Sequence, residues 1–106
     1  GGTTGILQSA GEPLGDVQVT VYRMEGGTPQ LKGSAITRLD GTFELVTKGA
    51  QGPLWLSPGD YRFTLETAGS PVEFPPEYAQ AEMTPLVIQW SAKESELRLS
   101  VPPGTN

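Results

Sequence analysis

Large apolar and polar side chains alternate along most of this chain. The alternation is clearest in residues 17–23, where valines are separated by polar residues, and it returns in residues 42–46, 61–66, 86–90 and 97–101. A period of two is typical of antiparallel strands that bury one side and expose the other. The side chains expected to face the core are Val17, Val19, Val21, Phe43, Leu45, Tyr61, Phe63, Leu65, Leu86, Ile88, Trp90, Leu97, Leu99 and Val101.

The residues between these positions, among them Thr20, Arg62 and Thr64, are expected to face solvent. Weaker patterns predict two more strands, at residues 3–8 and 34–38. Seven short strands separated by turns predict an all-β fold, a seven-stranded antiparallel β-sandwich. No segment has a helical period, although residues 76–83 could form one helical turn.

Turn-forming residues separate the predicted strands. They cluster at residues 11–16 and 26–29, and Asp40–Gly41 between two predicted strands indicates a hairpin, because glycine readily adopts a positive φ. Pro58 and Gly59 are expected to reverse the chain ahead of the strand that begins at Tyr61.

Length and composition agree with one small domain that is rich in turns. The chain has 106 residues, with 14 Gly and 10 Pro, which is enough for one hydrophobic core but not for two. We therefore expect a single domain over residues 1–106, with a frayed tail at residues 102–106.

The charge argues against two classes of partner. A net charge of −5 disfavours binding to nucleic acid and to an anionic membrane surface. The 12 carboxylates are scattered along the sequence, which indicates a role in solubility. No apolar run approaches the roughly 20 residues of a membrane-spanning helix.

The chain contains no Cys and no His. Disulfides, the usual zinc ligand sets, thiol nucleophiles and the commonest general base are therefore excluded. Metals with oxygen ligands alone stay open, but the single aspartate of Asp40–Gly41 falls short of a calcium loop. We predict neither a metal nor another cofactor.

The remaining arrangements for catalysis have no motif behind them. A Ser–Lys pair or a pair of carboxylates would have to be assembled from residues in turns and loops, where solvated side chains are the simpler interpretation. The candidates are Ser57, Ser91, Lys48 and Lys93, and Glu73, Glu77, Glu94 and Glu96.

The aromatic residues leave two alternatives open. Trp90 ends an alternating face and is expected in the core. Trp55 lies in a loop between two leucines, where it either stacks outward on a ligand such as a sugar ring or, as we prefer, covers the end of the sandwich. Phe74 and Tyr78, beside prolines, form either an exposed apolar patch or a lid on the core, and we prefer the lid. Trp55, Phe74 and Tyr78 are the candidates for contact with a ligand.

The order of three segments resembles the carboxypeptidase regulatory-like domain, a transthyretin-like (prealbumin-like) sandwich. The segments are GILQSAGEPLGDVQVTVYR, TRLDGTFEL and LSPGDYRFTLE. The residues that match the pattern of this family are Gly11, Pro13, Leu14, Gly15, Val17, Val19, Thr37, Asp40, Gly41, Phe43, Leu45, Leu56, Pro58, Gly59, Tyr61 and Phe63.

The C-terminal part, PPEYAQAEMTPLVIQW followed by ELRLSV, is similar to small bacterial lipoproteins that carry this domain and are abundant in planctomycetes. The matching residues are Pro76, Tyr78, Thr84, Pro85, Leu86, Leu97 and Leu99. The resemblance covers nearly the whole chain and implies a Greek-key, prealbumin-like sandwich. It also implies export to the periplasm or cell envelope, with a lipid-modified cysteine upstream of the domain.

The resemblance supplies no catalytic residue. The chain also differs from three classes of related protein. Zinc carboxypeptidases hold their metal in a separate domain. Hydroxyisourate hydrolases need His and a terminal motif such as YRGS, neither of which occurs here. Adhesin domains with an isopeptide bond need a Lys facing Asn or Asp; the only Asn is Asn106, so only a bond to Asp stays open.

The sequence therefore predicts a non-enzymatic module of the cell envelope with a structural, adhesive or scaffold role. The alternative is a carbohydrate- or peptide-binding module that uses Trp55, Phe74 and Tyr78. The partner would be a protein or glycan of the envelope, and the chain is expected to be a monomer. An exposed edge strand that accepts a strand of a partner is a further alternative.

Overall fold

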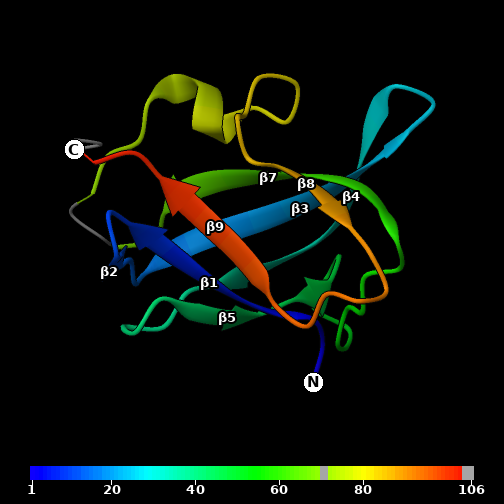
Figure 1. Cartoon of the computed structure of the whole chain (residues 1–106), viewed down its shortest axis with the longest axis horizontal. Helices are drawn as coiled ribbons and strands as arrows, with labels where there is room; N and C mark the ends of the chain where they lie inside the picture. The colour runs from blue at the N-terminus through cyan, green and yellow to red at the C-terminus, as the bar shows by residue number, and fades with distance from the viewer. Residues whose placement is uncertain (70–71, 104–106) are drawn as a thin grey trace.

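The computed structural model describes residues 1–69 and 72–103. These residues form an all-β fold in which two sheets pack against each other, with one turn of 3-10 helix (Figure 1). The elements are β1 (Thr4–Ser9), β2 (Glu12–Pro13), β3 (Val17–Glu25), β4 (Thr28–Ile36), β5 (Thr42–Glu44), β6 (Val46–Thr47), β7 (Gly59–Thr67), η1 (Pro76–Ala79), β8 (Val87–Trp90) and β9 (Leu97–Val101).

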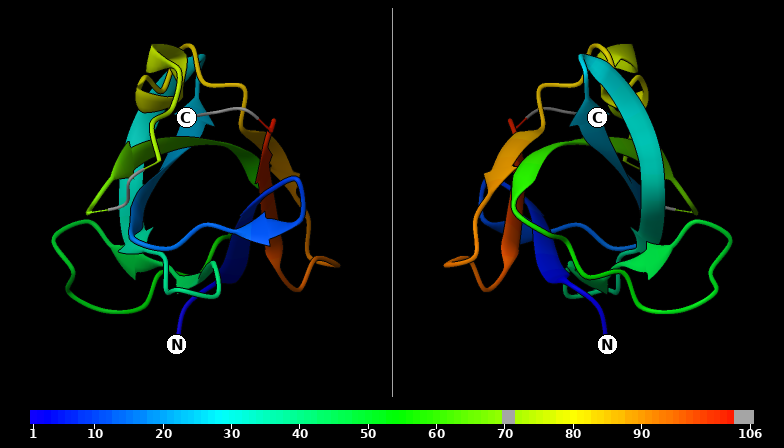
Figure 2. Two further views of the ribbon diagram at one scale, coloured as in Figure 1. Left: turned by 90° about the vertical axis from the view of Figure 1, so that its left-hand side faces the viewer. Right: turned by 90° about the vertical axis from the view of Figure 1, so that its right-hand side faces the viewer.

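The larger sheet has the strand order β6-β4-β3-β7-β8. In the smaller sheet, β9 pairs with β1 along one edge, and β5 and β2 pair with β1 along the other. Leu45 is the single residue between β5 and β6, so the chain passes from one sheet to the other there. Figure 2 shows the two sheets curving around a common interior, which the core side chains fill.

The predicted inward faces are confirmed. Thirteen of the fourteen predicted core side chains are buried, and the fourteenth, Ile88, is partly buried against them. The valines of β3 and Phe63 of β7 are fully buried, with no exposed area. Hydrophobic burial between the sheets is therefore the main source of stability of this fold.

Two residues expected to face solvent are buried instead. Thr20 and Thr64 are cross-strand neighbours in β3 and β7, with exposed fractions of 9% and 2%. The chain between β7 and β8 folds back over the outer face of the larger sheet, where η1 packs against β7 (Figure 2). The alternation within β3 and β7 could not predict that Thr20 and Thr64 are buried, because the segment that covers them follows later in the chain.

The strands differ from the prediction in number and in orientation. The described residues form nine strands, of which β2 and β6 have two residues each, so seven are longer. β9 runs parallel to β1, whereas every strand was expected to be antiparallel. An alternating strand looks the same in either orientation, and only the connection decides the orientation.

The predicted strand at residues 34–38 is the end of a longer one. β4 begins at Thr28, because Gly26 and Gly27 alone make the turn from β3, with φ values of 61° and 80°. Two consecutive positive φ values are typical of a two-residue hairpin loop. The predicted turn at residues 26–29 was therefore too wide.

The simple hairpin expected around Asp40–Gly41 is wrong. Gly41 does have a positive φ of 82°, and its N–H donates to the carbonyl of Arg38 at 2.8 Å. However, the strands on either side of the turn, β4 and β5, belong to different sheets, and only β6 returns to pair with β4. The crossing at Leu45 splits the predicted strand at 42–46 into two.

The predicted chain reversal at Pro58–Gly59 is also wrong in its detail. Gly59 already belongs to β7, pairs with Trp90, and does not have a positive φ. A Cβ atom at Gly59 would lie 2.6 Å from Nη2 of Arg23. A side chain at this position would therefore meet the Arg23 guanidinium, and no strained turn is involved.

Two segments outside the strands complete the chain. The helical turn expected within residues 76–83 is confirmed as η1. The predicted frayed tail lies outside the described residues from residue 104 onward. Before that point, the hydroxyl of Ser9 donates to the carbonyl of Pro102 at 3.2 Å.

Candidate functional site

The three aromatic candidates for ligand contact do not meet in space. Phe74 and Tyr78 belong to the segment at η1, whereas Trp55 belongs to the loop between β6 and β7. Figures 1 and 2 place these segments at opposite ends of the molecule, with the β6–β7 loop near the N-terminus. One ligand site built from all three residues is therefore excluded.

Phe74 and Tyr78 form a lid. Their ring centroids lie 6.2 Å apart at an interplanar angle of 39°, Tyr78 is buried, and Phe74 packs against the core in part. Burial, with a contribution from the nearby Glu77, raises the pKa of the Tyr78 hydroxyl above its usual value. The preferred interpretation of this segment as a lid is confirmed.

Trp55 instead projects into solvent, with 67% of its surface exposed. Leu54 and Leu56 on either side pack against the core, so the residue between them faces outward. The preferred expectation that Trp55 covers the end of the sandwich is therefore wrong, and the other alternative, an outward-facing indole, describes its position.

The backbone around Trp55 is fixed by hydrogen bonds. The N–H of Leu54 donates to the carbonyl of Leu45 at 3.0 Å, and the carbonyl of Leu54 accepts from Thr3 at 2.8 Å. The N–H of Leu56 donates to the Thr3 hydroxyl at 2.9 Å, and the carbonyl of Leu56 accepts from the indole of Trp90 at 3.2 Å. The Trp55 side chain therefore projects from a backbone that is held at both neighbouring residues.

Two open hollows meet at Trp55. One has a volume of about 530 Å³ and is lined by Thr3, Pro58, Trp90 and Glu94 among others. The second, of about 440 Å³, is lined by Arg23, Glu25, Lys32, Tyr61 and the loop itself. Trp55 and Leu56 line both hollows, so the exposed indole has polar groups within reach on two sides.

Arg23 fixes the floor of the second hollow. Its guanidinium donates to the Ser57 hydroxyl at 2.7 Å, the Tyr61 hydroxyl at 2.9 Å and the Pro58 carbonyl at 2.9 Å. It also lies over the Tyr61 ring, 5.4 Å from the centroid. Beside it, the Lys32 ammonium and the Glu25 carboxylate are 3.2 Å apart. No local pattern predicts Arg23, Glu25 and Lys32 at this place, because β3 and β4 bring them to Trp55 from more than twenty residues away.

The first two of the three segments behind the family resemblance contact each other away from Trp55. The carbonyl of Leu7 accepts from the N–H of Leu14 at 3.0 Å, and the N–H of Leu7 donates to the carbonyl of Gly41 at 2.8 Å. The buried Thr37 hydroxyl accepts from the N–H of Val17 at 3.0 Å. The hydrogen bonds of these motif residues therefore join one strand connection to another.

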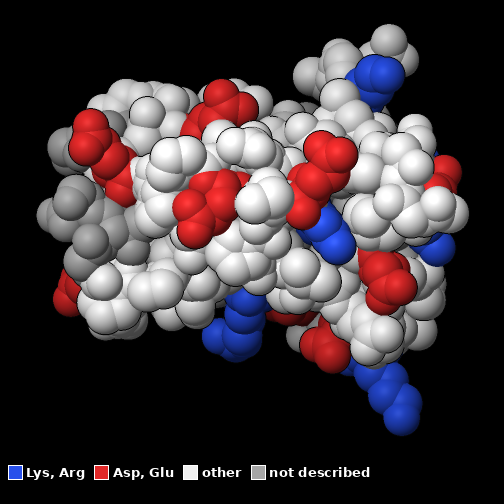
Figure 3. Space-filling view, turned by 90° about the horizontal axis from the view of Figure 1, so that it is seen from above, with Lys and Arg blue, Asp and Glu red and all other residues white. Residues whose placement is uncertain are grey.

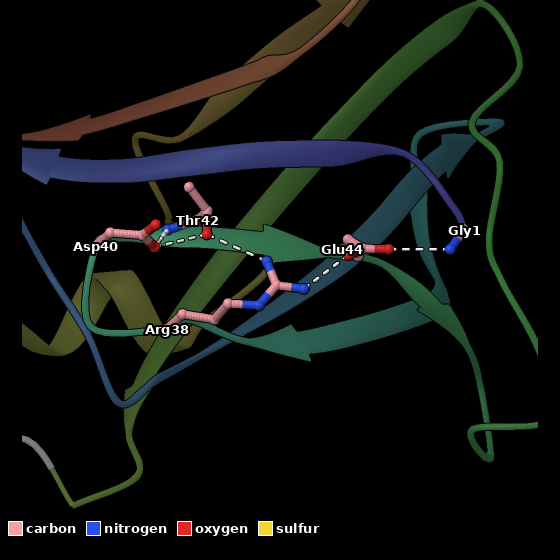
Figure 4. Close-up of polar contacts among 5 residues, drawn as sticks. All are labelled: Gly1, Arg38, Asp40, Thr42 and Glu44. Carbon is pink, nitrogen blue, oxygen red and sulfur yellow. Dashed lines mark hydrogen bonds and ion pairs between the residues drawn. The ribbon is translucent and has the colours of Figure 1, made fainter.

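The turn at Asp40 is stabilised in the same way (Figure 4). The Thr42 hydroxyl and N–H donate to the Asp40 carboxylate at 2.6 and 3.0 Å. The Arg38 guanidinium donates to the Thr42 hydroxyl at 3.1 Å and to Glu44 at 2.7 Å, and Glu44 also contacts the amino group of Gly1 at 3.0 Å.

These contacts lower the pKa of both carboxyl groups below their usual values. For Asp40 the hydrogen bonds from Thr42 are the main cause; for Glu44 the hydrogen bond from the Gly1 amino group and that from Arg38 are. Asp40 is exposed and Glu44 is partly exposed. Their hydrogen bonds join neighbouring residues of the turn, so we interpret this cluster as one that stabilises the turn.

Some of the other residues considered for catalysis lie close together, since Glu94 and Glu96 line one groove, and Ser91 and Glu94 line the first Trp55 hollow. Ser57 accepts a hydrogen bond from Arg23, and Glu96 pairs with Arg98 at 3.4 Å. Carboxylates are spread over the face above β7 and η1 (Figure 3). Across residues 1–69 and 72–103, no three acidic side chains gather as metal ligands would, and no helix has the length and apolar character to cross a membrane.

A scan against protein-family models finds no match to this sequence, and a search of curated proteins finds no matching relative.

Proposed function

We propose that this chain is a non-enzymatic β-sandwich module of the bacterial cell envelope with a structural, adhesive or scaffold role. In this proposal it is a prealbumin-like, Greek-key domain of the carboxypeptidase regulatory-like type. The seven strands longer than two residues would be the seven strands of that fold, with β2 and β6 as short extensions.

The observation that carries the proposal is that residues matching the family pattern form hydrogen bonds within the fold. The buried Thr37, the turn at Gly41 and the segment around Leu14 all contribute hydrogen bonds that tie one strand connection to another. A Cβ atom at Gly41 would lie 2.6 Å from the carbonyl of Leu7. Residues used in this way specify a scaffold, so the resemblance supports a structural module more than a catalytic one.

Fractionation of cells that produce the natural protein tests the location and the role together. An antibody against this chain should detect it in the envelope fraction, and deletion of the gene should alter adhesion or envelope integrity. Detection in the cytoplasmic fraction alone would contradict the proposal.

A second candidate function, carbohydrate or peptide binding, is favoured by one observation. Trp55 exposes a large apolar ring on a fixed backbone between two hollows whose walls include polar groups. The faces of sugar rings and of apolar side chains stack on such a ring, and the fixed backbone lowers the entropy cost of binding. In this function the adhesive contact of the module would lie at Trp55.

The two tryptophans make this candidate testable by NMR. Trp55 and Trp90 each give one indole N–H signal, and Trp55→Phe identifies the exposed one. Titration with cellulose, chitin and peptidoglycan oligosaccharides and with envelope peptides should shift the Trp55 signal, whereas Trp90, whose N–H is bonded to Leu56, should move less. No shift of Trp55 with any of these compounds would eliminate the second candidate.

A further inference from the structure

The two sheets are connected at Leu45. Strand pairing runs from β9 through β1 to β5 in the smaller sheet, and from β6 through β4, β3 and β7 to β8 in the larger one. β8 and β9 are therefore edge strands, and in the described residues each pairs with one neighbour only. Figure 2 shows these two edge strands at the same side of the molecule.

A groove of about 350 Å³ lies at this side of the molecule. It is lined by all four residues of β8, by Leu97 and Arg98 of β9, and by Glu94–Glu96 of the connection between them. The groove adjoins the first Trp55 hollow, with which it shares Trp90, Glu94 and Ser95, but Trp55 itself does not line it. The edge strands β8 and β9 lie along it. Unlike other surfaces, a sheet edge exposes backbone N–H and C=O groups that can pair with another strand.

The pairing of β7 with β8 shows which backbone groups face the groove. The N–H of Phe63 donates to the carbonyl of Leu86 at 3.0 Å, so this pair is hydrogen-bonded. Pairs alternate along an antiparallel ladder, so the pairs of Ile88 and Trp90 are also hydrogen-bonded to β7, whereas Val87 and Gln89 point their backbone groups away from it.

Three backbone groups on this edge are left without a partner among the described residues. The N–H of Val87 donates to the carbonyl of Pro85 at 3.0 Å. The carbonyl of Val87 and both the N–H and the carbonyl of Gln89 have no partner. A strand placed beside β8 could donate to the two carbonyls and accept from the N–H. These groups therefore favour an extended peptide backbone as the occupant.

The side chains around this edge add to the specification. Val87 is 56% exposed and provides an apolar contact on the outer face of the sheet. Asp60, the cross-strand neighbour of Gln89, and Glu94 at the groove are exposed acidic residues without an ion pair among the described residues. The occupant should therefore alternate apolar and polar residues and carry Lys or Arg next to them.

We propose that β8 accepts an extended, basic peptide segment of another protein, which adds a sixth strand to the larger sheet by pairing at Gln89. The added strand would enter the groove between β8 and β9, with its inward side chains over Ile88 and Trp90. Backbone hydrogen bonds would provide affinity, and the acidic groups would select the partner.

A single backbone N–H provides the decisive test. Gln89→Pro removes the N–H that points away from β7, and proline is tolerated at such a position on an edge strand. Gln89→Ala keeps the N–H and is the matched control. A random dodecapeptide library displayed on phage is selected on the wild-type chain, and the enriched peptides are synthesised and titrated against all three proteins.

Enriched peptides should be basic, should bind wild type and Gln89→Ala alike, and should bind Gln89→Pro at least about tenfold more weakly. Glu94→Gln should weaken binding about threefold, and the effect should shrink in high salt. In the wild type, hydrogen exchange of the Gln89 amide should slow when peptide is added, a readout that does not depend on the folding of a variant.

Enriched peptides that bind all variants equally, or a library that yields no peptide sensitive to Gln89→Pro, would overturn the proposal. So would an unchanged exchange rate of the Gln89 amide with peptide bound. A wild-type chain that dimerises by itself, and loses this property in Gln89→Pro, would overturn it in favour of a second copy as the occupant.

Discussion

The loop at Trp55 and the lid at Phe74 and Tyr78 look alike in sequence but have opposite surroundings. Each is an irregular segment that connects strands, and each contains both proline and a large aromatic side chain. In the lid, Tyr78 is 5% exposed; in the loop, Trp55 is 67% exposed. The aromatic content of a loop therefore does not indicate whether its rings serve the core or solvent.

The backbone decides the difference. Next to Trp55 the chain is hydrogen-bonded to Thr3, the residue before β1, and the two leucines on either side of Trp55 take the inward positions. At Tyr78 the backbone turns as a 3-10 helix that lies on β7 and directs the ring onto the sheet. Four predictions break or sharpen this contrast, from the largest effect to the smallest.

Phe63→Ala should cause the largest loss of stability, because Phe63 lies fully buried in the core. We expect a loss of about 3–5 kcal/mol in the free energy of unfolding, from lost burial and the cavity that remains. Denaturant unfolding followed by circular dichroism measures it. A loss below about 1 kcal/mol would show that the face of β7 is misassigned.

Tyr78→Ala should be the second largest change. The ring lies between η1 and β7, so we expect a loss of about 3 kcal/mol, at the lower end of the range for aromatic truncations. Tyr78→Phe, the matched control, keeps the ring and should lose less than about 1 kcal/mol. If Tyr78→Ala unfolds at the wild-type denaturant concentration, the segment is no lid.

Acidification should weaken the turn at Asp40. This side chain is exposed, as Trp55 is, but hydrogen bonds from Thr42 hold it in place. Its pKa is lowered from 3.8 in the folded chain. A lowered pKa stabilises the fold above the unfolded value, and this contribution disappears as pH falls through the folded value, below about pH 4. Asp40→Asn lacks the titrating group.

The comparison of wild type with Asp40→Asn in denaturant at several pH values measures this contribution. The gap in stability between the two proteins should be present at neutral pH and should close on acidification. A gap that stays constant with pH would exclude the carboxylate as its source.

Trp55→Ala should have the smallest effect on stability, within about 0.5 kcal/mol, because most of the ring is already in solvent. The same variant should abolish any binding to the Trp55 hollows. A loss of stability comparable to that of Tyr78→Ala would show that Trp55 is part of the packing and would remove the contrast between the two regions.

The sequence was a good guide to what each strand buries. Val19, Phe63 and Leu99 lie inside as their alternation predicts, because hydrophobic burial acts locally on each strand. It was a poor guide to contacts between distant segments. Thr64 was assigned to solvent because nothing near it in the chain indicates the cover, and the groove at Gln89 follows from a pairing register that no local pattern contains.

The candidate site shows the same limit. Trp55 could be selected from the sequence, since two leucines flank it and the core appeared complete without it. The groups that could assist it, Arg23 and Lys32, lie on β3 and β4 and reach it only through the sheet. Phe74 and Tyr78 were selected on equal grounds, and their packing removes them from that site.

By itself, the sequence determined the all-β class, the inward faces, the positive φ of Gly41 and the absence of histidine and cysteine chemistry. These follow from side-chain type and local spacing. Only the tertiary structure decided that β9 runs parallel to β1, that the chain changes sheets at Leu45, and that Trp55 stands free while Tyr78 is covered. Those outcomes depend on which distant segments pack together. The packing that buries the most apolar surface of the whole chain is favoured, and no single segment contains that information.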